Sequence, residues 1–181
     1  MTEQKNEVAR TEDLYLYCLV RTDLESLGTG KAVAHGVHVG NHMTWNHVVE
    51  PMKRGETQRR DVMDWHAIGG GFGTAIALGK NTQIDLRTLK AVIRTATDLG
   101  HVSGIIEDGT YPYLVPREIV PLIDASVHTA PPIMNAMGAM CFRKEITMGY
   151  VFGNKTDLEV ILTRFGLMPN DPVGETAVRQ K

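Results

Sequence analysis

A lysine and three histidines recur at helical spacing in the first quarter of the chain. Lys31, His35, His38 and His42 are separated by four, three and four positions, so in an α-helix their side chains lie on one side. A lysine close to a helix N-terminus opposes the positive end of the helix dipole, which favours anions there. A cation at that place is typical of a residue used for chemistry or for holding an anionic group.

Asp108 is the carboxylate best placed to act with Lys31. It follows an apolar segment at 102–107, as Lys31 follows the apolar segment 14–20. Loops at strand ends converge beside helix N-termini in α/β sheets, so the two residues meet at one edge if these strands are parallel. Lys31 would then stabilise developing negative charge while Asp108 positions an attacking water. A simple turn residue before Gly109 is the equally good alternative for Asp108.

Other chemistries fit the sequence less well. Segment 28–31 resembles part of a phosphate-binding loop, but Glu25 replaces its first glycine and Ala32 follows the lysine where Ser or Thr is needed. None of the three serines lies in a nucleophile elbow. The histidines could converge on a metal ion, but no carboxylate or cysteine completes their stripe, so we expect no metal and no cofactor.

Basic and aromatic side chains suggest a nucleic-acid partner. The basic residues that recur at helical spacing in the segment 85–99 are Arg87, Lys90 and Arg94, and those of the charged segment 53–64 include Lys53, Arg54, Arg59 and Arg60. Such groups bind a phosphate backbone, and Trp45 and Trp65 offer faces for base stacking. Solvated helix faces and core packing are the competing interpretations.

The bulk composition sets the class of protein. The chain has 181 residues, of which 43% are hydrophobic and 22% charged, with a net charge of −2. This size and balance predict one globular domain and exclude a wholly basic nucleic-acid binder. Two cysteines, Cys18 and Cys141, give no disulfide framework. Without a long apolar run or an apolar leader, we expect a soluble, cytoplasmic protein with no membrane partner.

The hydrophobic patterns predict an α/β fold with a small mixed sheet of about four strands and helices on both faces. The predicted strands are 14–21, 72–80, 102–107 and 146–152. The predicted helices are 31–43, 85–99 and one that begins near Thr156 with a capping box to Glu159, and the segment 45–52 is either helical or irregular. Segments 117–123 and 133–142 are compatible with short helices between prolines. We expect a domain at 14–166 with an extra segment around 117–144, and disordered tails at 1–13 and 167–181.

The first predicted helix also has a packing side. Its small and apolar residues are Val33, Gly36, Val37, Gly40 and Met43. We expect them to face the sheet and the histidine stripe to face outward.

Two motifs resemble those of the type-2 peptidyl-tRNA hydrolase family. Arg21-Thr-Asp-Leu24 with Gly30-Lys-Ala-Val-Ala34 and His38 is similar to the family's opening, and Ile105-Ile-Glu-Asp-Gly109 is similar to its second motif. The resemblance covers about residues 14–116, with 146–152 as a final strand. Four positions depart from the family pattern: His35 replaces a glutamine, Val39 an alanine, and Pro112 and Tyr113 a threonine-glutamine pair, for which Thr110 is an early substitute.

The resemblance implies a homodimeric enzyme that cleaves the ester between a peptide and the 3′ end of tRNA without a metal ion. Lys31 and Asp108 would be the catalytic pair, assisted by His35, His38 and Thr110. The substrate-binding residues would be Arg21, Asp23, Arg87, Lys90 and Arg94. Because the family's motif after Asp108 is replaced, a non-catalytic relative that binds tRNA or a protein in the same cleft is the alternative.

Overall fold

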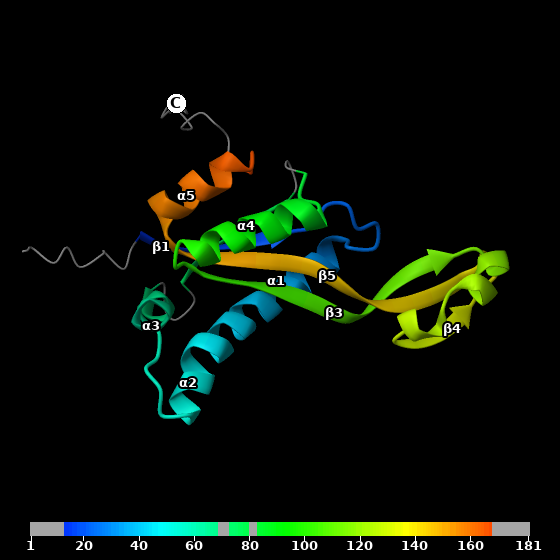
Figure 1. The fold of residues 1–181 in the computed structure, drawn as a ribbon, viewed down its shortest axis with the longest axis horizontal. Helices are drawn as coiled ribbons and strands as arrows, with labels where there is room; N and C mark the ends of the chain where they lie inside the picture. Colours follow the sequence, from blue (N-terminus) through cyan, green and yellow to red (C-terminus); the bar gives the residue numbers. More distant parts are fainter. Residues whose placement is uncertain (1–12, 69–72, 80–82, 168–181) are drawn as a thin grey trace, which may run out of the picture.

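The computed structural model describes residues 13–68, 73–79 and 83–167 and has a mixed α/β fold (Figure 1). Its strands are β1 (Leu14–Val20), β2 (Thr74–Leu78), β3 (Val102–Val115), β4 (Ala130–Met134) and β5 (Ala139–Asn154). Its helices are α1 (Thr29–Thr44), continued by a π-helical turn (Trp45–Val49) and α2 (Glu50–Lys53), then α3 (Arg60–Ala67), α4 (Leu86–Asp98) and α5 (Lys155–Arg164). Two 3₁₀ segments, Arg117–Leu122 and Ala125–Val127, lie between β3 and β4.

The five strands form one sheet in which β5 is the central strand. The order is β2-β1-β5-β3, and β4 also pairs with β5. Only the pairing of β1 with β2 is parallel; β5 is antiparallel to its three neighbours. β1 and β3 therefore run in the same direction on either side of β5, which brings their C-terminal halves to one end of the sheet.

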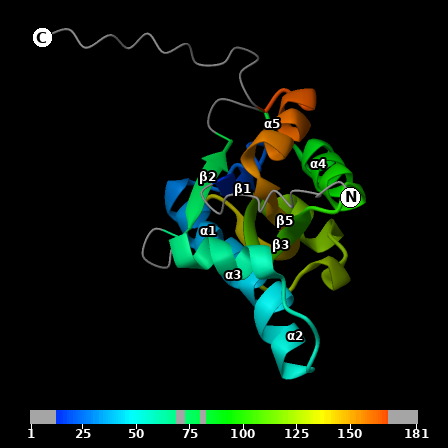
Figure 2. The same cartoon turned by 90° about the vertical axis from the view of Figure 1, so that its left-hand side faces the viewer.

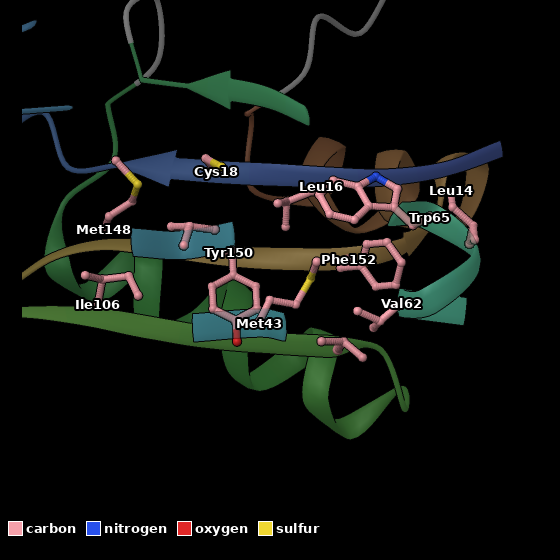
Figure 3. Close-up of a cluster of buried hydrophobic side chains, with 12 residues drawn as sticks. Leu14, Leu16, Cys18, Met43, Val62, Trp65, Ile106, Met148, Tyr150 and Phe152 are labelled. Carbon is pink, nitrogen blue, oxygen red and sulfur yellow. The ribbon is translucent and has the colours of Figure 1, made fainter. Parts of the chain in front are cut away.

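Helices cover both faces of this sheet, as the sequence predicts. Alternate residues of β1 point to opposite faces: Leu16 joins a core beneath α1 and α3, whereas Tyr17 joins a core beneath α4 and α5. Figure 2 shows the same two layers from the side. In the first core Trp65 packs edge-on against Phe152 at 5.7 Å between ring centres (Figure 3).

β3 and β5 extend past the body of the domain and form an arm with β4 (Figure 1). Tyr111 to Val115 of β3 pair with Arg143 to Ala139 of β5, and β4 pairs with the other edge of β5 there. The arm has its own small core around Val115, Ala139 and Cys141. It contains the segment 117–144 that the sequence marks as extra.

Several predicted elements are confirmed with shifted ends. The strand 14–21 and the helices 31–43 and 85–99 are present, the segment 45–52 is helical, and Asp85 caps α4 by accepting a hydrogen bond from the Thr88 N–H at 2.7 Å. The last helix is capped by Asn154, which accepts from the Thr156 N–H, so the predicted Thr156 cap is wrong by two positions. Residues 1–12 and 168–181 of the expected tails, the glycine-rich segment 69–71 and the predicted strand ends at Phe72 and Lys80 lie outside the described residues. Leu167 does not belong to a disordered tail, because it is 2% exposed and joins the core beneath α4 and α5.

Three predictions are corrected by the structure. The charged segment 53–64 contains the start of helix α3, whose buried face is Val62 and Trp65. Segment 133–142 is not helical but forms parts of β4 and β5, where Ala139 and Cys141 of β5 pack against Val115 of β3. The third predicted strand does not end at residue 107. It continues to Val115, and its last residues belong to the arm.

The predicted packing side of α1 is confirmed for Met43 and wrong for Val33 and Val37. Met43 is fully buried, whereas Val33 and Val37 are 65% and 61% exposed, and the helix buries His35 and Val39 instead. A histidine can occupy this inner face because polar groups of the sheet meet both of its ring nitrogens.

Candidate functional site

His35 is the centre of the candidate site, because it lies buried between α1 and the sheet. Its Nδ1 is 2.9 Å from the hydroxyl oxygen of Thr147, which donates a longer hydrogen bond of 3.4 Å to the carbonyl of Ile106. In the tautomer that carries the proton on Nδ1, the Thr147 hydroxyl accepts from the imidazole and Nε2 keeps its lone pair.

A bulge in β5 gives Thr147 its position. Ile106 pairs with Met148 and Glu107 pairs with Ile146, so Thr147 is an extra residue without a partner on β3. Bulges re-aim a side chain relative to the simple alternation of a strand. Strict alternation would send Thr147 to the α4 face with Gly149 and Val151. The bulge turns it toward His35 instead, which is why the sequence pattern did not mark it as a site residue.

Asp108 lies on the other side of the imidazole. Its Oδ2 is 3.8 Å from Nε2 of His35, and its side chain is 16% exposed. Its Oδ1 accepts a hydrogen bond of 2.8 Å from the Thr110 N–H within a second irregularity, between Asp108 and Tyr111 of β3. Thr110 is itself exposed, and its hydroxyl is 3.4 Å from the same carboxylate oxygen. The Asp-Gly-Thr turn therefore fixes the carboxylate against His35.

Lys31 approaches the same centre from the first turn of α1. Its Nζ lies 4.7 Å from the centre of the Tyr111 ring. This nitrogen is shielded from solvent and has no hydrogen-bond partner within the described part of the chain. A shielded ammonium with free donors is suited to an anionic oxygen. Tyr111, which sequence reasoning missed, is held in place because its hydroxyl accepts a hydrogen bond of 3.1 Å from the Ser26 N–H.

The charges of Lys31 and Asp108 both change the pKa of His35. Burial is the main cause that lowers the pKa of His35 below its usual 6.5; the Asp108 carboxylate raises it, and His38 and Lys31 lower it further. The net shift is downward, so the imidazole is neutral at pH 7 and its Nε2 can accept a proton. The structure thus brings His35 to 3.8 Å from Asp108, and Lys31 lies close enough for its charge to act on the pKa of His35.

A groove of about 820 Å³ runs from this centre along α1. Its α1 side presents His38 and His42 and ends at Trp45, and its β3 side is formed by residues 105–109. His38 meets the His35 ring edge-on at 5.8 Å between ring centres, and Nδ1 of His42 lies 3.0 Å from the Tyr150 hydroxyl. Trp45 is 47% exposed, and Lys53 lies over its ring at 4.0 Å.

The predicted substrate-binding residues lie apart from this groove. Arg21 uses its guanidinium inside the protein, where it pairs with Asp23 and Glu145 and donates to the Ile146 carbonyl. Arg87, Lys90 and Arg94 belong to α4, which covers the opposite face of the sheet from α1. These three basic residues therefore do not line the groove, and their role in binding the substrate stays a prediction.

The basic residues between α1 and α3 are paired with neighbouring carboxylates. Arg54 contacts Glu56 at 3.0 Å and Arg59 contacts Asp61 at 2.7 Å. Within residues 13–68, 73–79 and 83–167, no three His, Cys, Asp or Glu side chains gather in a way that would hold a metal ion. None of the helices in these ranges is both long and apolar enough to span a bilayer.

Comparison with protein-family models and with curated proteins identifies no relative of this chain. No protein-family model matches the sequence, and a search of curated proteins finds no significant match.

Proposed function

We propose that this protein hydrolyses the ester bond between a peptidyl group and the 3′ end of tRNA. The observation that carries the proposal is a buried imidazole 3.8 Å from the Asp108 carboxylate, to which we assign the tautomer with the proton on Nδ1, and a shielded Lys31 ammonium whose charge acts on its pKa. These are the groups that water attack on an ester requires: a base, an orienting carboxylate and a cation for the oxyanion.

The separation between His35 and Asp108 suits a shared water. At 3.8 Å the two groups are too far apart for a hydrogen bond to each other, but one water can donate to both acceptors. As its oxygen attacks the ester carbonyl carbon, one proton passes to Nε2 of His35. Lys31 stabilises the resulting oxyanion, and the imidazolium returns the proton to the departing 3′-hydroxyl. Asp108 favours the imidazolium through its charge.

The groove along α1 supports a single-stranded nucleotide end as the leaving group. It leads away from the reacting centre past His38 and His42 to the exposed ring of Trp45. Aromatic faces bind unpaired bases at about 1–3 kcal/mol per base, and imidazoles donate hydrogen bonds to phosphate and ribose oxygens. Trp45 is therefore the stacking platform that we propose for the unpaired 3′ nucleotides.

Release of N-acetyl-phenylalanine from N-acetyl-phenylalanyl-tRNA tests the proposal. The purified chain should cleave this ester, and Lys31→Ala should lower kcat about 10²–10³-fold, as removal of one oxyanion donor does. Lys144→Ala is the matched control, because Lys144 is a 71% exposed lysine of β5 paired with Glu107. Full activity of Lys31→Ala would refute the assigned role. Tight, salt-sensitive tRNA binding without turnover would favour the non-catalytic relative instead.

A further inference from the structure

The base of the arm forms a second cavity that shares a wall with the reacting centre. It has a volume of about 420 Å³, within the range of about 300–1,000 Å³ that small-ligand pockets span. Its apolar and aromatic lining consists of Leu24, Tyr111, Pro112, Tyr113, Leu114 and Met140. We call it the arm pocket. The shared wall is Tyr111, whose ring contacts Lys31.

We propose that the arm pocket binds the acyl side of the ester, and in particular a large apolar side chain next to the scissile bond. This inference rests on the proposed function and assigns a direction to the substrate. The nucleotide end would follow the groove toward Trp45, while the peptide would leave the centre past Tyr111. The two cavities border the Lys31–His35–Asp108 centre through different residues, Asp108 for the groove and Tyr111 for the arm pocket.

The charges around the arm pocket fit an uncharged acyl group and oppose a phosphate. Its one cation, Arg143, is paired with Glu145 at 2.7 Å and lies over the ring of Tyr113 at 4.9 Å. Asp23 is paired with Arg21. The exposed carboxylate of Glu25 also lines the pocket, so the local charge is negative. A nucleotide phosphate would be repelled here, whereas an N-acylated amino acid carries no charge while it is joined to the tRNA as an ester.

Two residues of the pocket offer apolar surface for a side chain to cover. Leu114 and Met140 are direct cross-strand partners in β3 and β5 and are 55% and 38% exposed. Side chains opposite each other in antiparallel strands lie side by side on one face. Covering a large apolar side chain contributes about 1.5–3 kcal/mol, which corresponds to about a 10- to 100-fold gain in affinity.

The test compares two adenosine analogues whose 3′ position carries N-acetyl-phenylalanine or N-acetyl-glycine through an amide in place of the ester. Calorimetry should show about 10-fold or more tighter binding of the phenylalanyl analogue to the wild-type chain. Leu114→Trp, which fills the pocket from an exposed position, should remove that preference and leave glycyl binding unchanged. Met140→Trp should do the same from the opposite strand. The control Met137→Trp lies at an 81% exposed arm position outside the pocket and should have no effect.

The outcomes separate this inference from the proposed function. Equal affinity for both analogues, or equal effects of the pocket and control substitutions, would overturn the acyl pocket even if the ester is hydrolysed. A phenylalanyl preference that Leu114→Trp abolishes, in a chain that cleaves no ester, would support the pocket and reject the hydrolase.

Discussion

The hydroxyl oxygen of Thr147 lies 2.9 Å from Nδ1 of His35, although 112 positions separate the two residues in the chain. The contact joins the central strand β5 to the inner face of α1. With the proton on Nδ1, this contact leaves the lone pair of Nε2 facing Asp108. The catalytic role that we propose for His35 depends on this contact.

Thr147→Val tests this dependence with little change in volume. The valine leaves Nδ1–H of His35 buried without its acceptor, which should cost about 1–3 kcal/mol in the free energy of unfolding. Ester cleavage should also fall, since the imidazole is no longer held in one tautomer. Urea unfolding and single-turnover rates measure the two effects. Thr97→Val in α4, whose hydroxyl donates to the Ile93 carbonyl on the other side of the sheet, should leave the cleavage rate unchanged.

The pH dependence of cleavage should report the neutral form of His35. Its pKa lies below the usual 6.5 because burial disfavours the imidazolium. The pH profile of kcat/KM should therefore fall at acid pH, with its midpoint below 6.5. The His35→Gln variant should cleave the ester more slowly and should not show this decrease of kcat/KM at acid pH. An identical decrease in His35→Gln would mean that the titrating group is not His35.

The same shift predicts a pH effect on folding. The unfolded chain binds a proton at His35 more readily than the folded chain, so the contribution of this residue is fully present above the unfolded pKa. It is lost as the pH falls from about 6.5 through the lowered folded pKa. Unfolding midpoints at pH 7.5 and 5.0 should therefore differ less for His35→Gln than for the wild-type chain. An equal decrease of the unfolding midpoint in both proteins would contradict the effect of burial on the pKa of His35.

We expect the ring of Tyr111 to position Lys31, and the hydroxyl of Tyr111 to contribute less to kcat. Tyr111→Phe keeps the ring that lies under the Lys31 ammonium, whereas Tyr111→Leu removes a cation–π contact of about 0.5–2 kcal/mol. With an N-acetyl-glycyl substrate, which makes little use of the arm pocket, Tyr111→Leu should lower kcat about 2- to 30-fold more than Tyr111→Phe does. Equal rates in the two variants would show that the ring does not hold the lysine.

Gly104 should tolerate no side chain. A Cβ at this position would lie 2.7 Å from the Tyr150 ring, so Gly104→Ala should destabilise the fold by about 1–3 kcal/mol through overpacking. At Gly40 in α1 a Cβ meets no atom within 4 Å. Gly40→Ala should instead stabilise the protein by about 0.5–1 kcal/mol through helix propensity. Thermal unfolding compares the two, and a stable Gly104→Ala would contradict the packing of β3 on β5.

The parts of the fold that the sequence predicts are those with local signals. α4 has an apolar stripe, a capping Asp85 and the C-terminal Gly100 at φ +83°, and the structure confirms it. The inner face of α1 could not be predicted in this way. A histidine at a buried position needs partners such as Thr147 and Asp108, and these come from strands far away in the chain.

The arm and the bulges also could not be predicted from local patterns in the sequence. Pro131 and Pro132 speak against regular structure, yet both belong to β4, a short strand that pairs on only one side, where a missing N–H is tolerated. Thr147 breaks the alternation of β5 only because β3 lacks a residue opposite it. Such features depend on pairing between strands, which a pattern within one strand does not contain.

A comparison of two aspartates tests the central claim most directly. Asp108 faces Nε2 of His35, whereas Asp98 is an exposed residue of α4, on the opposite face of the sheet, and lies 3.8 Å from Arg94. Single-turnover cleavage of N-acetyl-phenylalanyl-tRNA should be about 10²-fold or more slower in Asp108→Asn than in the wild-type chain, and nearly unchanged in Asp98→Asn. Equal rates in the two variants, or a wild-type rate no faster than the buffer, would contradict the proposed hydrolase.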